Sequence, residues 1–282
     1  MLVSLALIAF AANSILARLA LTETAIDPIS FTAVRLASGA LMLVLIVYFR
    51  RDRRKAPITS QSTVQTRLIS AAALLAYALL FSLAYVSITA ATGALLLFGA
   101  VQLSMLGWTV LRGERLEALA WCGVGLALAG LIWLLLPGLE RPPLWPALMM
   151  VGAGMAWAVY TLQGRGQDDP TTITASNFVL AAVPISLYAL IRYSEMSLDT
   201  YGLVLAVLSG ALASGLGYVI WYAALPRIRT RTAAVAQLQV PVITALAGVV
   251  LLSEPLSLRL VLAGSIILGG IILVIAPWRK RR

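Results

Sequence analysis

The chain has 282 residues, of which 61% are hydrophobic and 11% are charged. Soluble domains carry about a quarter charged residues, so this composition excludes a globule exposed to water on all sides. The formal net charge is +10, but the basic residues stand in short clusters between apolar runs, which excludes a nucleic-acid-binding surface. The chain has no histidine and a single cysteine, and His-based metal sites and general bases are therefore excluded. We expect no metal ion or other cofactor.

Ten apolar runs of membrane-spanning length follow one another along the chain. They cover residues 2–21, 29–49, 66–85, 89–111, 117–136, 144–163, 171–192, 200–224, 231–252 and 258–277. Runs of about 18 or more apolar residues with few charges are typical of transmembrane helices. The sequence therefore predicts an all-α, polytopic membrane protein with ten transmembrane helices in a lipid bilayer. The first run contains Arg18 and lacks a basic leading segment, so we interpret it as a retained helix and not as a signal peptide.

The basic residues are concentrated in alternate loops. One set of loops and the C-terminal segment hold Arg50, Arg51, Arg53, Arg54, Lys55, Arg67, Arg112, Arg115, Arg165, Arg227, Arg229, Arg231, Arg279, Lys280, Arg281 and Arg282. The opposite loops hold only Arg141, Arg192 and Arg259. Because cytoplasmic loops carry the excess of lysine and arginine, we expect both termini to be cytoplasmic and the protein to lie in a bacterial-type inner (plasma) membrane.

The two halves of the chain share motifs in the same order. Asp27-Pro28-x-x-x-Thr32-Ala33 recurs as Asp169-Pro170-x-x-x-Thr174-Ala175 at an offset of 142, and a longer match at an offset of 140 pairs Glu114-x-Leu116 with Glu254-x-Leu256. We predict two repeats, residues 1–139 and 140–282, of five helices each. Because five is an odd number, the second copy is expected to be inverted in the membrane. Inverted repeats place a substrate site near the middle of the bilayer, between the halves, and support alternating access.

Polar and aromatic side chains inside the spans are the candidates for a substrate site, because polar groups are costly in the membrane and usually face a cavity or another helix. The residues that we expect to bind substrate are Asn13, Tyr77, Tyr85, Gln102, Trp157, Tyr160, Asn177, Tyr218, Trp221, Gln237 and Gln239. For Trp157, in the middle of its span, a place in a cavity wall and a place in helix packing are both open.

The sharpest local pattern is Gln237, Gln239 and Pro241 in the ninth span. Proline has no N–H to bond the carbonyl of residue 237, so we expect a kink with a free carbonyl beside polar side chains, a common way to build a site inside a membrane. A kink satisfied by a neighbouring helix is the alternative. Pro184 indicates a similar break with fewer polar neighbours, for which packing is favoured.

Three charged residues are expected, with Pro241, to have gating or structural roles. Arg35 stands inside the second span, where it can reach the membrane surface, bond a carbonyl group or hold a substrate carboxylate; a structural role is favoured. Glu114 and Glu254 belong to the repeated Glu-x-Leu turns and are expected to cap helices. All eleven acidic residues fall in loops or at span ends. The lack of a carboxylate in mid-span argues against proton antiport and for facilitated movement down a gradient.

Small residues recur at matching positions of the fifth and tenth spans. They are Gly123, Gly125 and Gly130 in the fifth span and Gly264, Gly269 and Gly270 in the tenth. Such stripes allow close contact between helices, so these two spans are expected to pack against each other. We expect a monomer or a weak homodimer.

These features resemble the drug/metabolite transporter superfamily, and within it the ten-helix EamA-type branch. The resemblance rests on the two five-helix copies, on Asp27-Pro28 followed by Arg35, and on the paired Glu-x-Leu turns. It implies an exporter with a central cavity lined by helices from both halves. The aromatic residues Tyr77, Tyr85, Trp157 and Trp221 are similar to those of aromatic amino acid exporters that also pass organic cations such as paraquat.

We therefore expect a transporter that exports amino acids and related small metabolites by alternating access. The alternative is a multidrug or organic cation exporter, against which the lack of a mid-span carboxylate counts. An enzyme is not expected, because the spans contain no nucleophile–base pair, metal cluster or paired acids.

Overall fold

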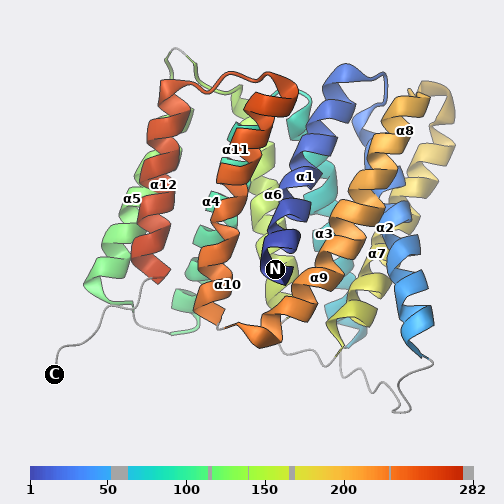
Figure 1. The fold of residues 1–282 in the computed structure, drawn as a ribbon, viewed down its shortest axis with the longest axis horizontal. Coiled ribbons are helices and arrows are strands. Elements are labelled where there is room, and N and C mark those ends of the chain that lie inside the picture. The colour runs from blue at the N-terminus through green and yellow to red at the C-terminus, as the bar shows by residue number, and fades with distance from the viewer. Residues whose placement is uncertain (52–62, 114–115, 139, 165–168, 229, 276–282) are drawn as a thin grey trace.

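The computed structural model describes residues 1–51, 63–113, 116–138, 140–164, 169–228 and 230–275. Its elements in chain order are α1 (Leu2–Glu23), α2 (Pro28–Arg51), α3 (Val64–Tyr85), α4 (Ala90–Leu111), α5 (Ala118–Leu135), α6 (Leu144–Gln163), α7 (Pro170–Ile191), η1 (Tyr193–Glu195), α8 (Thr200–Val207), η2 (Leu208–Leu216), α9 (Gly217–Ala224), η3 (Leu225–Arg227), α10 (Thr230–Gln237), α11 (Gln239–Leu252) and α12 (Leu258–Ile275). In this part of the chain, ten helical stretches are long and apolar enough to cross a membrane (Figure 1), which confirms the predicted number.

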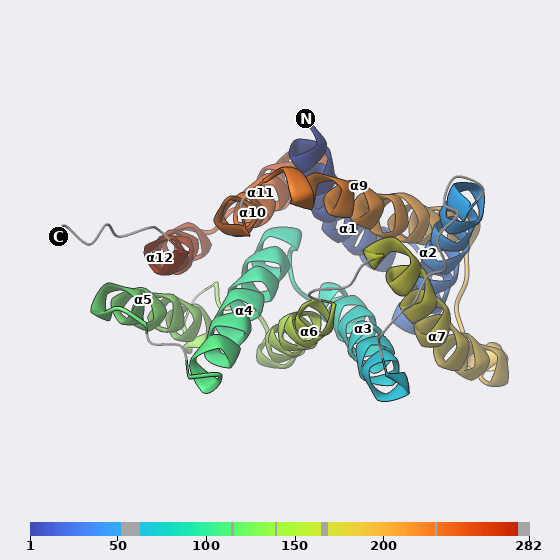
Figure 2. The same cartoon turned by 90° about the horizontal axis from the view of Figure 1, so that it is seen from below.

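The helices stand in two rows, and each row mixes helices from both halves of the chain (Figure 2). One row contains α12, α10 with α11, α1, α8 with α9, and α2; the other contains α5, α4, α6, α3 and α7. Within the rows α1 packs against α11 and the α8–α9 stretch, and α6 packs against α4 and α3 in the same pattern. The pairs α2–α7 and α5–α12 join the rows. Exchanging the two halves of the chain converts one row into the other, as expected for a duplicated five-helix unit.

The repeated Asp-Pro motif begins corresponding helices of the two halves. Asp27 Oδ1 accepts hydrogen bonds from the backbone N–H groups of Ile29 (2.9 Å) and Ser30 (3.0 Å) at the beginning of α2. Asp169 Oδ1 accepts from the N–H of Thr172 (3.3 Å) at the beginning of α7. An aspartate satisfies free N–H groups at a helix start, and proline tolerates the first helical position because it has no N–H. The motif therefore has a structural explanation in both copies.

The eighth span contains a π-helix, η2, which was not predicted from the sequence. Its Gly210 lies so close to α2 that a Cβ atom there would stand 2.1 Å from the backbone oxygen of Arg35. Only glycine allows this approach, because any side chain would collide with backbone atoms. A π-turn inserts one extra residue per turn and occurs frequently at functional sites. Here it also places Ser209 and Ser214 in the protein interior, each 2% exposed or less.

The helices α5 and α12 pack as a pair through glycine, as predicted. A Cβ atom at Gly123 would lie 2.5 Å from the backbone oxygen of Gly270, and one at Gly270 would lie 2.6 Å from the backbone oxygen of Gly123. Gly130 also faces α12, whereas Gly125 and Gly269 meet nothing within 4 Å. Only part of each predicted stripe therefore forms the contact.

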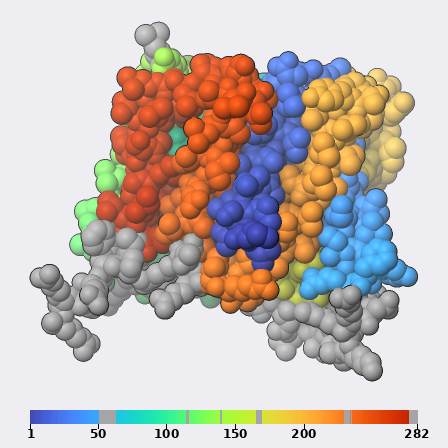
Figure 3. All heavy atoms as spheres, viewed as in Figure 1, coloured from blue at the N-terminus to red at the C-terminus, as the bar shows by residue number. Residues whose placement is uncertain are grey.

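The two spans with a proline well inside them behave differently. The ninth span is interrupted at Leu238, between α10 and α11, three residues before Pro241. In contrast, α7 continues through Pro184 without interruption. On the face shown in Figure 3, α1 lies between α10 and α11 on one side and the α8–α9 stretch on the other. The interruption in the ninth span therefore lies beside the helix that occupies the middle of the row.

Candidate functional site

A central cavity lies between the two rows and is lined by helices from both halves. Its lining residues are Phe10, Asn13, Ser14, Tyr77, Phe81, Leu97, Phe98, Trp157, Ala213, Ser214, Tyr218 and Gln237. They come from α1, α3 and α4 of the first half and from α6, η2, α9 and α10 of the second. The space between these side chains is about 30 Å³, enough for about two water molecules. The cavity is thus nearly filled by its own side chains in this conformation.

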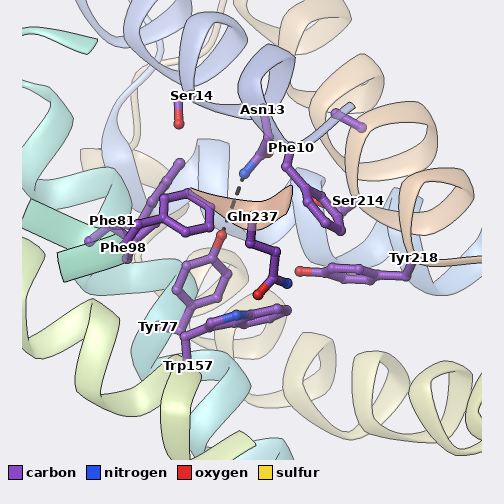
Figure 4. Close-up of a pocket in the computed structure, with 12 residues that line it drawn as sticks. Phe10, Asn13, Ser14, Tyr77, Phe81, Phe98, Trp157, Ser214, Tyr218 and Gln237 are labelled. Carbon is purple, nitrogen blue, oxygen red and sulfur yellow. Dashed lines mark hydrogen bonds between the residues drawn. The ribbon is translucent and has the colours of Figure 1, made fainter. Parts of the chain in front are cut away.

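Aromatic side chains make up half of the residues that line the cavity (Figure 4). The ring of Trp157 stacks on that of Tyr218 with a centroid distance of 5.4 Å and an interplanar angle of 20°. Tyr77 packs on the same indole with a centroid distance of 4.9 Å, and Phe10 contacts Tyr218 at 5.8 Å. Such contacts hold large side chains in defined positions. The ring of Trp157 therefore links tyrosines from the two halves of the chain.

Polar groups meet at one side of this aromatic wall. Asn13 Nδ2 lies 3.5 Å from the hydroxyl of Tyr77, and Asn13 Oδ1 accepts a 2.7 Å hydrogen bond from Ser209. The side chain of Gln237 extends into the space between Tyr77, Trp157 and Tyr218 (Figure 4). The hydroxyl of Ser214 is buried and has no hydrogen-bond partner among the residues that the structure describes. The cavity therefore combines amide and hydroxyl groups with aromatic faces, and its lining contains no carboxylate.

Arg35 stands directly behind the wall of this cavity. Its side chain is 2% exposed, so it does not reach the membrane surface. Nη2 donates a 3.1 Å hydrogen bond to the hydroxyl of Tyr77, while the guanidinium carbon lies 4.7 Å from the ring centroid of Phe81 and 5.3 Å from that of Tyr77. Both rings also line the cavity. The positive charge of Arg35 is thus separated from the cavity by a single layer of side chains.

The residues expected to bind substrate fall into three groups. Asn13, Tyr77, Trp157, Tyr218 and Gln237 line the central cavity. A second group is buried but lies outside the lining: Tyr85, Tyr160, Asn177 and Trp221. Three of these contact rings of the lining: Tyr85 contacts Phe81, Tyr160 contacts Trp157, and Trp221 contacts Phe10. Gln102 and Gln239 lie elsewhere: Gln102 lines a separate cavity of about 150 Å³ with residues of α4, α5 and α12, and the side chain of Gln239 is exposed. The structure therefore brings together about half of the expected residues.

Several lining residues were not predicted as site residues. Phe10, Phe81, Leu97, Phe98 and Ala213 are apolar, so nothing in the sequence distinguishes them from side chains that face lipid. The serines Ser14 and Ser214 carry the same polar signal as Asn13, and that signal could have identified them. Their small size makes them easy to explain as packing residues.

Glu254 has a second role beyond the predicted cap. Its Oε2 accepts a 2.8 Å hydrogen bond from the backbone N–H of Ala90 at the beginning of α4, so it does cap a helix, although not its own. Its Oε1 pairs with Nε of Arg18 at 2.8 Å. Arg18 also donates to the backbone oxygens of Tyr85 and Val86. Glu114, its counterpart in the first half, lies outside the described residues.

Comparison with known proteins gives full-length and half-length relatives. The chain is 51% identical to an uncharacterised protein of Pseudomonas aeruginosa over 277 residues, which covers 98% of this chain and 94% of that protein. It is 24% identical to an uncharacterised transporter of Archaeoglobus fulgidus over 98% of this chain and 96% of the relative. The threonine/homoserine exporter RhtA of Escherichia coli K12 is 31% identical over 154 residues, about half of each chain.

A solved crystal structure has the same fold, with a TM-score of 0.63, 22% sequence identity and coverage of 96% of this chain and 97% of that chain. The model of the EamA-like transporter family matches twice, over residues 1–136 and 144–276. These two matches leave out only the connection between the halves and the last few residues. The ten spans, the duplication and the cavity between the halves agree with this assignment. The chain belongs to the EamA-like transporter family, which is a family of membrane transporters and not of enzymes.

Proposed function

We propose that this protein exports amino acids and related small metabolites through the central cavity. The observation that carries the proposal is the composition of that cavity: amide and hydroxyl groups for a polar head, beside stacked rings of Trp157 and Tyr218 for an apolar body. Ligand sites typically combine a mostly apolar wall with a few placed polar groups. Residues Asn13, Tyr77, Trp157, Tyr218 and Gln237 would contact the substrate, with Tyr85, Tyr160, Asn177 and Trp221 supporting them.

The half-length similarity to the threonine/homoserine exporter RhtA favours amino acids among small metabolites. That similarity covers about half of each chain, so it supports the substrate class only. The aromatic wall is large for a threonine side chain, and we expect the protein to accept amino acids with larger apolar side chains as well.

Alternating access is the transport mechanism that we propose. Corresponding helices of the two halves stand in opposite rows, which is the pattern of an inverted repeat. Such a repeat supports two similar conformations that open to opposite sides of the membrane. In this conformation the cavity has room for only about two water molecules, and we propose that the two rows separate to admit an amino acid. The interruption of the ninth span at Leu238 lies next to Gln237 and supplies a hinge point.

We also propose the setting in which this transport takes place. The distribution of basic residues over the loops supports cytoplasmic termini in an inner (plasma) membrane. The described residues bury the cavity within one chain, which supports a functional monomer or a weak homodimer. No part of this mechanism requires a cofactor.

An organic cation exporter is the second candidate, and the aromatic wall favours it. Stacked aromatic rings attract cations through their negative faces. However, the lining contains no carboxylate to balance a cationic substrate, and the positive charge of Arg35 lies directly behind Tyr77 and Phe81. The electrostatic environment therefore favours zwitterions over cations.

Transport into proteoliposomes tests both candidates. Purified protein in liposomes loaded with one unlabelled amino acid should exchange it for the labelled form, across a panel that includes threonine and the aromatic amino acids. Paraquat and quaternary ammonium dyes form the second arm, and protein-free liposomes are the control. Exchange of cations without exchange of any amino acid would replace the proposed function by the second candidate.

A further inference from the structure

The guanidinium group of Arg35 is a buried charge with unsatisfied donors. Within the described part of the chain its Nε and Nη1 atoms have no hydrogen-bond partner, and Nη2 alone is bonded, to Tyr77. Among the described residues no carboxylate pairs with it. The rings of Phe81 and Tyr77 stabilise part of the charge. Buried charges are otherwise paired and buried N–H groups otherwise bonded, so this arrangement requires a functional explanation.

Arg18 in the same protein shows how a structural arginine is satisfied. Its Nε bonds the carboxylate of Glu254, and its Nη1 bonds the backbone oxygens of Tyr85 and Val86. Arg35 is more deeply buried than Arg18, yet it has one bond to a neutral hydroxyl. A purely structural role would leave two donors of Arg35 unsatisfied in the membrane interior, where their cost is high.

The hydroxyl of Tyr77 carries the effect of Arg35 to the cavity. This oxygen accepts from Nη2 of Arg35 at 3.1 Å and lies 3.5 Å from Nδ2 of Asn13, so both neighbours act as donors toward it. A hydroxyl that accepts in this way still has its own hydrogen to donate. No described residue accepts that hydrogen. A hydroxyl that accepts a hydrogen bond from a cation is polarised, and its own hydrogen then bonds an anionic acceptor more strongly.

The second half of the chain lacks this charge at the corresponding place. Tyr218 stands 141 residues after Tyr77, within the offsets of the repeat, and the position equivalent to Arg35 is Asn177. The neighbouring Tyr160 is hydrogen-bonded to the neutral side chains of Asn177 and Thr174. Thr174 accepts from Tyr160 at 3.4 Å and donates to Tyr222 at 3.5 Å. The cavity is therefore electropositive on one side only, which suits a ligand with a single anionic group.

We propose that Arg35 and Tyr77 recognise one carboxylate group of the transported molecule, so that the protein selects carboxylic acids and zwitterions over otherwise similar amines and amides. This inference rests on the proposed function to the extent that the central cavity is the transport site. Tyr77 donates to the carboxylate, and the free N–H groups of Arg35 supply the positive charge that compensates it. The hydroxyl of Ser214, also buried without a partner, is a further donor on the cavity wall.

A matched series of ligands tests the proposal on the wild-type protein. L-threonine, 3-hydroxybutyrate, L-threonine amide and threoninol share a small hydroxylated skeleton, but only the first two have a carboxylate. Binding is measured as the rise in unfolding temperature of the detergent-purified protein, because a ligand that binds the folded state stabilises it. Both carboxylates should raise the temperature and the other two should not. Equal stabilisation by threonine and its amide overturns the proposal, as does the failure of every carboxylate in a panel widened to other amino acids.

Variants identify the residues that make this distinction. Arg35→Gln and Tyr77→Phe should each weaken carboxylate binding about tenfold or more, the effect of losing one charge-assisted hydrogen bond, and Arg35→Lys should weaken it less. Arg50→Gln is the control, because it removes a charge from the same helix at the end where Arg50 bonds Thr171. Unchanged carboxylate binding in both Arg35→Gln and Tyr77→Phe would exclude this pair. If Arg35→Gln does not fold, Tyr77→Phe and the wild-type series decide the question.

The two proposals fail in different ways. Exchange of threonine and threonine amide at equal rates in proteoliposomes would retain amino acid transport and remove the role of Arg35 in recognising a carboxylate. Stabilisation by 3-hydroxybutyrate and other simple carboxylates, without exchange of any amino acid, would retain the carboxylate site and remove the proposed amino acid substrate.

Discussion

Arg18 on α1 and Glu254 after α11 form an ion pair with an Nε–Oε1 distance of 2.8 Å, which ties the first helix of one half to the last connection of the other. The side chains are 18% and 10% exposed. Glu254 also caps the beginning of α4 through Ala90, and Arg18 also bonds the end of α3 through Tyr85. One pair of side chains therefore joins four segments of the chain at this end of the bundle.

Replacement of Glu254 should separate the two functions of its carboxylate. Glu254→Ala removes the ion pair and the cap and should destabilise the protein by about 2–3 kcal/mol, because Arg18 and the N–H of Ala90 lose a partner. Glu254→Gln keeps an acceptor for Ala90 and should cost about half as much. Thermal unfolding in detergent measures both. Glu195→Gln is the control, since its pair with Arg192 is exposed to solvent and contributes little to stability. Equal effects of Glu254→Gln and Glu195→Gln would contradict a structural role for Glu254.

The glycine contact between α5 and α12 predicts opposite effects at two neighbouring positions. A Cβ atom at Gly123 would lie 2.5 Å from a backbone oxygen that cannot move aside easily, whereas one at Gly125 meets nothing within 4 Å. Gly123→Ala should therefore destabilise the protein by about 1–3 kcal/mol. Gly125→Ala should be neutral or stabilise it by up to about 1 kcal/mol, because alanine favours the helix. Equal unfolding temperatures for the two variants would exclude the close contact.

Removal of cavity side chains should reduce transport without reducing the amount of folded protein. Trp157→Ala deletes the ring that stacks on Tyr218 and should lower amino acid exchange about tenfold, and Gln237→Ala should lower it by about fivefold. Trp121→Ala is the matched control, because Trp121 is 52% exposed and lies on α5, away from the cavity. Expression and gel filtration report folding. Normal exchange in both cavity variants would place the transport site elsewhere.

Transport should not depend on a pH gradient. None of the residues that line the central cavity is a carboxylate, and the lining therefore has no group of the type that usually carries protons in antiporters. Amino acid exchange in proteoliposomes should proceed at the same rate with a pH gradient imposed or collapsed by an ionophore. A strict requirement for the gradient would show coupling to protons and would direct attention to Glu254 at the span end.

The number and extent of the helices could be predicted because lipid imposes a simple rule. Apolar runs must satisfy their backbone groups internally, so a run such as Leu2–Glu23 becomes a helix whatever its neighbours are. The role of Asp27 could be anticipated for a similarly local reason, since an aspartate before a proline satisfies the N–H groups that follow it. Asn13, Trp157 and Gln237 were found because a polar or amphipathic side chain in mid-span is costly without a purpose.

Other features depend on the rotation of each helix about its axis, which a run of apolar residues does not encode. Gln102 and Gln239 carry the same polar signal as Gln237, but their helices turn them away from the central cavity. Phe81 and Phe98 line it although nothing in their local sequence separates a cavity wall from a lipid-facing surface. The π-helix around Gly210 shifts the register of the eighth span and brings Ser209 to Asn13, 196 residues away in the chain.

By itself the sequence determined a ten-helix membrane protein with two similar halves, because hydrophobic length and repeated motifs are local properties of the chain. Only the tertiary structure decided that corresponding helices of the two halves stand in opposite rows and that Arg18 meets Glu254. It also decided that Arg35 stands behind Tyr77, with no carboxylate partner among the described residues. These relationships arise from packing between segments far apart in sequence. In a chain that is 61% hydrophobic, many alternative helix pairings have similar composition, and the fit of particular side chains selects among them.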